Sequence, residues 1–356
     1  MLRYYLSLTV LSARILLAPV TAQAVVIDTV LVGNPGNAPT TLAGVGQMGA
    51  VDYYYRMGTF EITNAQYVEF LNAKAASDPL QLWDKGGEQV ATTGISRSGA
   101  SGSYDYAPLP DMADKPVNNV TFFDAVRFVN WLHNDQGIGD TETGSYTLLG
   151  GTPIPSNANT LARNPNATWV LPTEDEWVKS AYFDARNASA GGPPGDDHYW
   201  TYPTASDAVP TKGTADSAGN ISNPGANVAN YGGGANWNGP PGVELTTVGS
   251  AGPLSTSHYG TYDQAGNAME WSTSTLGTAP RVVLGGSYLA VFTAPTLTIE
   301  GHSVAEIADV QPGTFDPMVG FRVVYLPEPS TFALAALAVA GAIVIGRARR
   351  GTPGSS

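Results

Sequence analysis

The chain has 356 residues, of which 41 are Gly, 26 are Pro and none is Cys. Gly and Pro together make up about a fifth of the sequence, against roughly 12% in ordinary proteins, which favours a fold rich in turns and loops over a helical bundle. The lack of cysteine excludes thiolate nucleophiles, disulfides and cysteine-ligated metals. The net charge of −13 argues against nucleic acid and anionic lipid as partners of the main body, because like charges repel.

The first 24 residues have the pattern of a secretory signal peptide. Arg3 precedes apolar stretches, and the small residues Ala22 and Ala24 flank Gln23 in the form of a cleavage site. We therefore expect cleavage after Ala24 and export of the protein. The alternative is a poorly formed N-terminal strand.

Three short helices are predicted in the body of the chain. Each begins at a threonine that has a Gln, Asp or Glu three residues later, the spacing of a capping box, in which the two side chains satisfy free backbone N–H groups. Apolar residues then recur every three or four positions and predict one buried face. These helices are expected over 63–75, over 121–133 and from 173 onward.

Short strands are predicted between and after the helices, separated by long stretches rich in Gly, Asn, Pro and Ser. The two longest such stretches, 96–110 and 185–242, are expected to be loops, and loops of this length are often functional. The sum is one α+β domain over 25–326 with little regular structure. The strands are expected at 51–60, 169–171, 268–272, 281–288 and 320–326.

Residues 327–350 have the order of a sorting signal. Pro327, Glu328 and Pro329 precede an uncharged segment, 331–346, and three arginines follow within 347–350. A helix over the uncharged segment reaches about 24 Å, somewhat short of a roughly 30 Å hydrocarbon core, so that it spans only with thinning or snorkelling arginines. This order resembles the PEP-CTERM signal of Gram-negative bacteria.

That resemblance implies recognition by an exosortase, a membrane protease. The protein would then be attached to or released from the cell surface, with membrane contact through the C-terminal helix and a short tail at 351–356.

Six phrases occur in a fixed order over the body. Together they resemble the formylglycine-generating enzyme, or sulfatase-modifying factor, family. The resemblance implies a C-type-lectin-like α+β fold with low secondary-structure content. The phrases are MGTFEITN at 57–64, PVNNVT at 116–121, LPTEDEW at 171–177, YGTYDQAGNAMEW at 259–271, Arg281 with GGSY at 285–288, and GFR at 320–322.

The family resemblance also implies a chemistry that this chain lacks the residues to perform. Such enzymes oxidise a sulfatase cysteine with O2 and a copper(I) ion held by two thiolates, since soft Cu(I) prefers soft ligands. The family positions fall on Ala290 and Pro295, which cannot bind metal, while Ser287 remains. We therefore expect no copper and no oxidase activity. The alternative is a copper or non-haem iron oxidase with altered ligands.

Calcium is the cofactor that the resemblance still supports. Ca2+ takes six to eight oxygen ligands and mixes carboxylates with backbone carbonyls. The family's calcium-binding phrase places here the carboxylates of Asp263 and Glu270 and the carbonyls of Gly266 and Ala268. The alternative is a plain turn-to-strand junction.

A second family calcium site begins with an Asn and the next residue's carbonyl. Asn230 and Tyr231 match this pattern, and Asn227 and Val228 are a rival alignment. The family's downstream Asp is missing from 236–242, so we expect this site to be lost or rebuilt.

The sequence as a whole predicts an exported, non-catalytic, calcium-stabilised binding or structural module at the cell surface or in extracellular matrix. The two long loops would form its recognition surface for a polysaccharide or protein ligand. The sequence does not name that ligand or the oligomeric state.

Overall fold

The structure, a computed structural model, describes residues 24–42, 46–83, 94–275, 281–290 and 316–327. Residues 1–23 of the expected signal peptide, Pro295, Glu328, Pro329 and the apolar segment 331–346 lie outside these ranges. Within them, no helix combines the length and apolar character needed to cross a bilayer.

The three predicted helices are confirmed. They are α1 (Asn64–Lys74), α2 (Phe122–His133) and α3 (Glu174–Tyr182), and each begins with a complete capping box. In each, the threonine side chain accepts the N–H of the third helical residue, whose own side chain accepts the threonine N–H. Such a cap stabilises a helix by about 1 kcal/mol. Two short 3-10 helices, η2 (Ala158–Thr160) and η3 (Ala188–Ala190), lie in loops.

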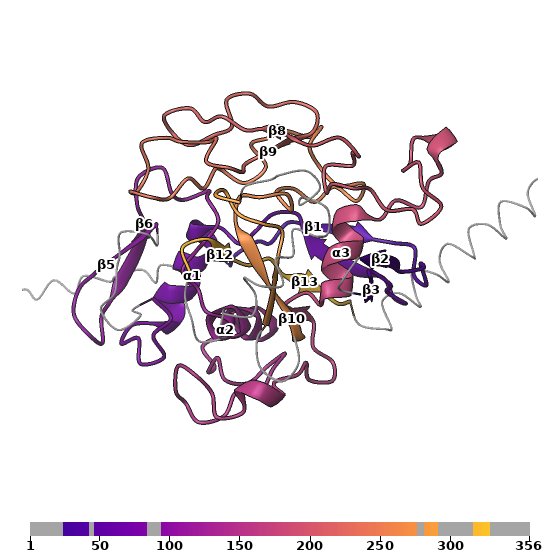
Figure 1. The fold of residues 1–356 in the computed structure, drawn as a ribbon. Coiled ribbons are helices and arrows are strands. Elements are labelled where there is room, and N and C mark those ends of the chain that lie inside the picture. Colours follow the sequence, from indigo (N-terminus) through magenta and orange to yellow (C-terminus); the bar gives the residue numbers. More distant parts are fainter. Residues whose placement is uncertain (1–23, 43–45, 84–93, 276–280, 291–315, 328–356) are drawn as a thin grey trace, which may run out of the picture.

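Two small sheets form the centre of the fold (Figure 1). The first is antiparallel and has the order β1 (Thr29–Val32), β4 (Tyr55–Gly58), β13 (Val324–Tyr325), β7 (Trp169–Val170). The second is mixed: β10 (Met269–Thr275) pairs antiparallel with β11 (Arg281–Leu284) and parallel with β12 (Val319–Gly320).

The predicted strand 320–326 is therefore two strands in two sheets. Gly320 pairs with β10, whereas Val324 pairs with both β4 and β7. Between them the Phe321 carbonyl accepts the Ile62 N–H at 2.9 Å. The chain crosses from one sheet to the other at this point, which a continuous apolar run does not reveal.

Three two-stranded ladders complete the strands. They are β2 (Thr40–Leu42) with β3 (Gly46–Met48), β5 (Ile95–Ser98) with β6 (Asp105–Pro108), and the parallel pair β8 (Thr211–Lys212) and β9 (Val228–Ala229). The expectation that 96–110 is a loop was wrong, because β5 and β6 form a hairpin there.

Side-chain contacts, two of them with residues outside the hairpin, hold the hairpin in place. The Asn72 amide accepts the Tyr106 N–H at 2.9 Å and donates to the Tyr106 carbonyl at 3.0 Å, as a neighbouring strand would. The Arg97 guanidinium lies between the rings of Trp83 and Tyr104, at 4.3 and 4.2 Å from their centroids. Cation–π contacts of this kind are worth about 0.5–1 kcal/mol at partly exposed sites.

One hydrophobic core joins the helices to both sheets. In α2 every residue from Phe122 to Leu132 is buried, whereas α1 buries one face that includes Tyr67, Phe70 and Leu71. Phe128 of α2 packs edge-on against Phe321, at 5.3 Å between ring centroids. Burial of a large apolar side chain contributes about 1.5–3 kcal/mol, so this core holds the sheets in place.

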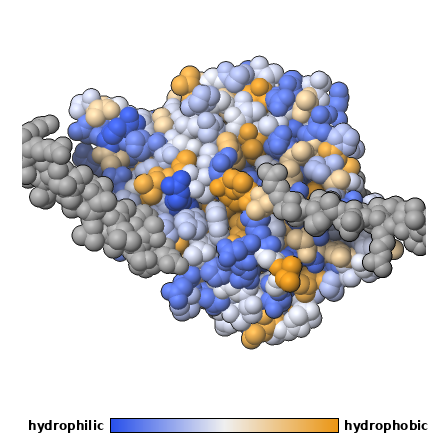
Figure 2. All heavy atoms as spheres, turned by 180° about the vertical axis from the view of Figure 1, so that it is seen from behind, coloured by the Kyte–Doolittle hydropathy of each residue, from blue (hydrophilic) through white to orange (hydrophobic). Residues whose placement is uncertain are grey.

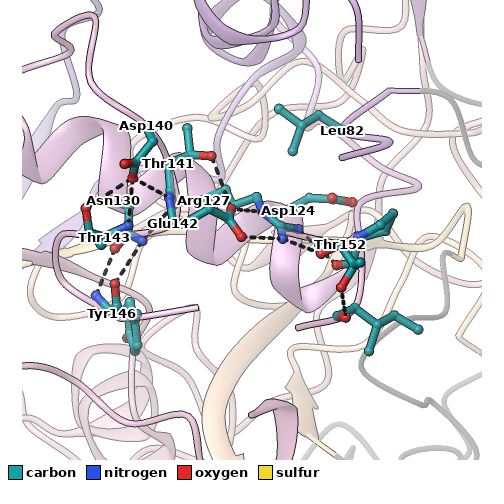
Figure 3. A network of polar contacts seen from close by, with 12 residues as sticks. Leu82, Asp124, Arg127, Asn130, Asp140, Thr141, Glu142, Thr143, Tyr146 and Thr152 are labelled. Atoms are coloured by element: carbon teal, nitrogen blue, oxygen red, sulfur yellow. Dashed lines mark hydrogen bonds and ion pairs between the residues drawn. The ribbon is translucent and has the colours of Figure 1, made fainter. Parts of the chain in front are cut away.

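A buried arginine ties the loop after α2 to that helix (Figure 3). The Arg127 side chain donates to both carboxylate oxygens of Glu142, at 2.6 and 3.1 Å, and to the carbonyls of Thr152 and Pro153. Asn130 donates to the carbonyls of Thr141 and Tyr146 one turn further along. These bonds fix an otherwise irregular segment against α2.

The surface is mixed in character. Seen from the side opposite to Figure 1, hydrophobic residues form small groups between hydrophilic ones (Figure 2).

Candidate functional site

The structure brings the two predicted calcium segments together. The Asn230 carbonyl accepts the Asn267 N–H at 2.8 Å, and the Asn230 amide donates to Asn267 Oδ1 at 3.1 Å. Gly266 makes this approach possible, because a Cβ at its position would lie 2.1 Å from the Asn230 oxygen. Its φ of +88° also favours glycine. The residues of the two segments therefore form one polar site.

Glu270, the acid expected to complete the first calcium site, is held by two other residues. Its carboxylate accepts Nε and Nη2 of Arg322 at 2.5 and 2.6 Å, and the Trp177 indole N–H at 2.7 Å. Both members of the ion pair are fully buried. The carboxylate of Glu270 thus already has a cation, the guanidinium, and its role as a calcium ligand stays a prediction.

A second buried acid, Glu61, belongs to this site and was not predicted from the sequence. Its Oε1 accepts the Asn267 amide at 3.1 Å, while its Oε2 has no partner. Burial, reinforced by the charges of Asp263 and Glu270, raises the pKa of Glu61 well above its usual range. Burial likewise raises the pKa of Asp263 to about 6, although the carboxylate accepts the Gly249 N–H.

Two buried oxygens without a partner lie at Asn230, a residue of the second predicted calcium site, and at Glu244. Asn230 Oδ1 and Glu244 Oε2 are both buried and have no hydrogen-bond partner. The two residues touch, since the Asn230 amide donates to the Glu244 carbonyl at 2.8 Å. Buried polar atoms in proteins are nearly always paired, so such orphans indicate a missing water or ion. Glu244 was missed because an Asp was sought closer to Asn230.

The rival alignment at Asn227 and Val228 fits less well. The Asn227 side chain accepts the Thr204 hydroxyl at 2.6 Å and donates to the Ala208 carbonyl at 2.9 Å. Val228 pairs in β9. The Asn227 amide is thus already satisfied, whereas that of Asn230 keeps an unpartnered oxygen. The Tyr231 carbonyl accepts the Gly234 N–H at 3.2 Å, a weak bond.

No three His, Cys, Asp or Glu side chains converge as a metal-ligand set within the described part of the chain. An ion at either predicted site would therefore depend on amide and carbonyl oxygens as well as carboxylates. Calcium accepts such mixed oxygen sets.

Ala290, the first position that corresponds to a copper ligand of the family, lies in a turn after β11. Ser287 Oγ donates to Met318 Sδ at 3.4 Å and accepts the Leu289 N–H at 3.3 Å, and the Ala290 N–H donates to the Ser287 carbonyl at 3.0 Å. Tyr288 is fully buried and donates to the Gly242 carbonyl. Pro295 is outside the described residues.

A family profile decides the relationship. Residues 43–326 match the sulfatase-modifying factor enzyme 1-like domain, which is most of the chain. The chain belongs to this family. The few helices and the mixed sheets agree with that assignment, while the C-type-lectin-like description stays a prediction.

Solved structures of three proteins resemble this member of the sulfatase-modifying factor family. CarF shares 23% identity over 85% of this chain and 99% of its own, with a TM-score of 0.49. The Treponema denticola variable protein 1 shares 19% over 87% and 100%, with a TM-score of 0.49. PvdO from Pseudomonas aeruginosa shares 14% over 85% and 92%, with a TM-score of 0.38. No curated protein sequence matches the chain significantly.

Apolar side chains surround the turn that would hold copper in the enzymes of the sulfatase-modifying factor family. Ala290 contributes a methyl group and Met318 a thioether, which already accepts the Ser287 hydroxyl. Burial, with smaller effects of the Asp316 and Glu244 charges, raises the pKa of Tyr288 to about 12. The buried members of this apolar group are Met112, Val243, Leu245, Ala268 and Tyr288, and Leu109, Trp237 and Met318 pack against them.

Proposed function

We propose that this protein is an exported, non-catalytic member of the sulfatase-modifying factor family, acting as a calcium-stabilised binding or structural module. The absence of cysteine from the whole sequence supports the non-catalytic part, because two thiolates hold the copper in the enzymes that the sequence resembles. Neither Ala290 nor Pro295 has a side chain that can replace them.

The observation that carries the calcium proposal is the pair of orphaned oxygens, Asn230 Oδ1 and Glu244 Oε2. An amide and a carboxylate oxygen are hard ligands of the kind that Ca2+ prefers. Leaving them buried without a partner costs about 1–3 kcal/mol each. A bound calcium ion would remove that cost, so its binding and the stability of the domain should be linked.

Calcium at this site would strengthen a part of the fold with little regular structure. Asn230 follows β9, and Glu244 lies just after the long stretch 185–242. We infer that the ion joins these segments to the turn at Asn267, to which the Asn230 amide donates. The Asp263–Glu270 site is proposed as a second, weaker candidate, because Glu270 already pairs with Arg322.

Localisation is part of the same proposal. The signal peptide at 1–24 and the sorting signal beginning at Pro327 support export and handling by an exosortase-type protease of a Gram-negative bacterium. The protein would then act on the cell surface or in the extracellular matrix.

Thermal unfolding in calcium tests the proposal. The purified protein is melted in EDTA, in Ca2+ and in Mg2+. A ligand at one hundred times its Kd stabilises the folded state by about 2.7 kcal/mol, so Ca2+ should raise the Tm by several degrees. The Glu244→Gln variant should lose this increase, whereas Glu69→Gln, an exposed matched control on α1, should keep it.

Two results would contradict this proposal. A Tm that is the same in Ca2+ and EDTA would refute the calcium site. Aldehyde formation on a sulfatase-derived thiol peptide, in the presence of O2 and copper, would refute the non-catalytic assignment.

A further inference from the structure

A row of aromatic and polar side chains crosses the surface where β1, the end of α3 and the loop before Tyr262 meet. It consists of Tyr54, Asn34, Tyr259, His258, Trp200 and Arg186. We propose that this aromatic row binds a neutral polysaccharide. The inference deepens the proposed binding function by naming a ligand class and a surface, and the row contains none of the residues assigned above to calcium or to the degenerate copper position.

The first half of the row is built around the turn after β1. The Tyr259 hydroxyl donates to Asn34 Oδ1 at 3.0 Å and lies 3.4 Å from the Gly33 carbonyl. The Tyr54 ring covers Gly33 itself, since a Cβ on Gly33 would meet Tyr54 Cε1 at 3.9 Å. The two tyrosines therefore flank one exposed turn.

The second half is organised by one buried carboxylate. Asp184 accepts the Trp200 indole N–H at 3.3 Å and two N–H groups of the Arg186 guanidinium. His258 Nδ1 lies 3.3 Å from the same carboxylate, and the His258 and Tyr259 rings are in edge contact at 5.3 Å between centroids. The row is thus continuous from Tyr54 to Arg186.

The hydrogen bonds described above engage only some of the polar atoms of these side chains, which leaves other groups for a ligand. Tyr54 is 43% exposed, and the side chains of Arg186 and His258 are 46% and 26% exposed. Among the described residues, no hydrogen bond engages Arg186 Nη1, His258 Nε2 or the Asn34 amide nitrogen. Rings and donors held in place before binding reduce the entropy lost on binding.

These features match a sugar polymer. The C–H face of a pyranose ring stacks on an aromatic side chain, while its hydroxyls accept from N–H donors beside the ring. Tyr, Trp and His suit such a ligand because each has an apolar body and a polar edge.

The charges favour a neutral ligand over an acidic one. Asp184 neutralises Arg186 through paired hydrogen bonds. Burial lowers the pKa of His258, so that near pH 7 the imidazole is mainly uncharged. The protein as a whole has a net charge of −13. An anionic polymer would be repelled by this overall charge without a compensating cationic surface in the row.

A protein partner fits the row less well. Tyr54 is the one member of the row among the exposed large hydrophobic residues that the structure describes. Protein interfaces generally need a desolvated apolar centre, whereas saccharides bind to shallow amphipathic surfaces of this kind.

Affinity electrophoresis of the full mature protein tests the proposal. Native gels contain dextran, hydroxyethylcellulose or galactomannan as neutral probes, and alginate as an acidic one. At least one neutral polymer should retard the wild-type protein. Tyr54→Ala and Arg186→Ala should each weaken that binding at least fivefold, while Tyr54→Phe, which keeps the ring, should bind nearly as the wild type does.

Ile154→Ala serves as the matched surface control, since Ile154 is 57% exposed in the loop after α2. Its binding should be unchanged, and melting curves should show that all variants fold. The proposal is overturned if no neutral polymer retards the protein, if both alanine variants bind as tightly as the wild type, or if only alginate binds. Failure here leaves the calcium-dependent Tm untouched, so the two proposals fail separately.

Discussion

Replacing Glu270 by Gln should destabilise the protein more than any surface change of the same kind. The substitution removes a negative charge that faces Arg322 in a fully buried ion pair. Arg322 would keep its hydrogen bonds to the carbonyls of Gly58 and Tyr262, at 3.0 and 2.9 Å. Its positive charge, however, would lose the one carboxylate that hydrogen-bonds to it, and only the more distant charges of Glu61 and Asp263 would still act on it.

The size of the effect follows from the loss of that direct pairing. Removing one member of a buried pair typically costs about 3–5 kcal/mol. For a domain of this size, 1 kcal/mol corresponds to roughly 2–4 °C in Tm, so the expected decrease is on the order of 6–20 °C. Glu270→Gln keeps the shape of the side chain and can still accept the Trp177 indole N–H, so the loss reports chiefly on charge.

Urea unfolding followed by tryptophan fluorescence measures the change. Arg322→Met is the complementary variant, and Glu270→Gln with Arg322→Met completes a double-mutant cycle. The double variant should lose less stability than the two single losses added together, because the second change removes the charge that the first had left unpaired. All variants are compared in EDTA and in Ca2+.

The reasoning would be refuted by a loss below about 1 kcal/mol for Glu270→Gln in EDTA, the range expected of exposed pairs. A loss seen in Ca2+ but not in EDTA would instead identify Glu270 as a calcium ligand rather than the partner of Arg322.

Three further changes have defined outcomes in the same unfolding assay. Gly266→Ala should lower the free energy of unfolding clearly more than Gly36→Ala. Both glycines have positive φ, but a Cβ on Gly266 would meet a carbonyl oxygen at 2.1 Å, whereas one on Gly36 would meet nothing within 4 Å. Equal losses of stability would contradict the steric argument. Thr121→Ala should cost about 1 kcal/mol by removing the α2 cap, and Thr121→Ser should restore most of it; a neutral alanine variant would disprove the cap's contribution. Burial lowers the pKa of Lys179 to about 8 from 10.5, so between these pH values the unfolded chain binds more protons than the folded one. The free energy of unfolding should therefore rise from about pH 8 to 10.5 in the wild type relative to Lys179→Met. Parallel pH profiles of the two proteins would show that the lysine has no such effect.

The helices were predictable because their signals are local. Each capping box lies within four residues, and the apolar faces of the helices follow a short period. The hairpin of β5 and β6 was not predictable in this way, since Asn72 and Trp83 contact it from outside the segment. Gly and Ser in that segment indicated a loop.

The candidate site was only partly visible for a similar reason. Family phrases pointed to Asn230 and to the turn at Gly266, and the structure places them in contact. Glu61 belongs to the first phrase and Glu244 to none of the six, and only the folded chain shows that carboxylate oxygens of both are buried beside this site. The pairing of Glu270 with Arg322 likewise joins segments that the sequence keeps apart.

The position of β13 constrains how this chain can be made. β13 is the last described strand along the chain, yet it lies inside its sheet, between β4 and β7. A ribosome or a translocon releases the N-terminal residues first, so an emerging chain has a gap in the middle of this sheet until residues 324 and 325 arrive. The domain can therefore reach its final packing only after almost its entire length has been synthesised. Premature termination shortly before β13 would leave β4 and β7 each without the neighbour that joins them.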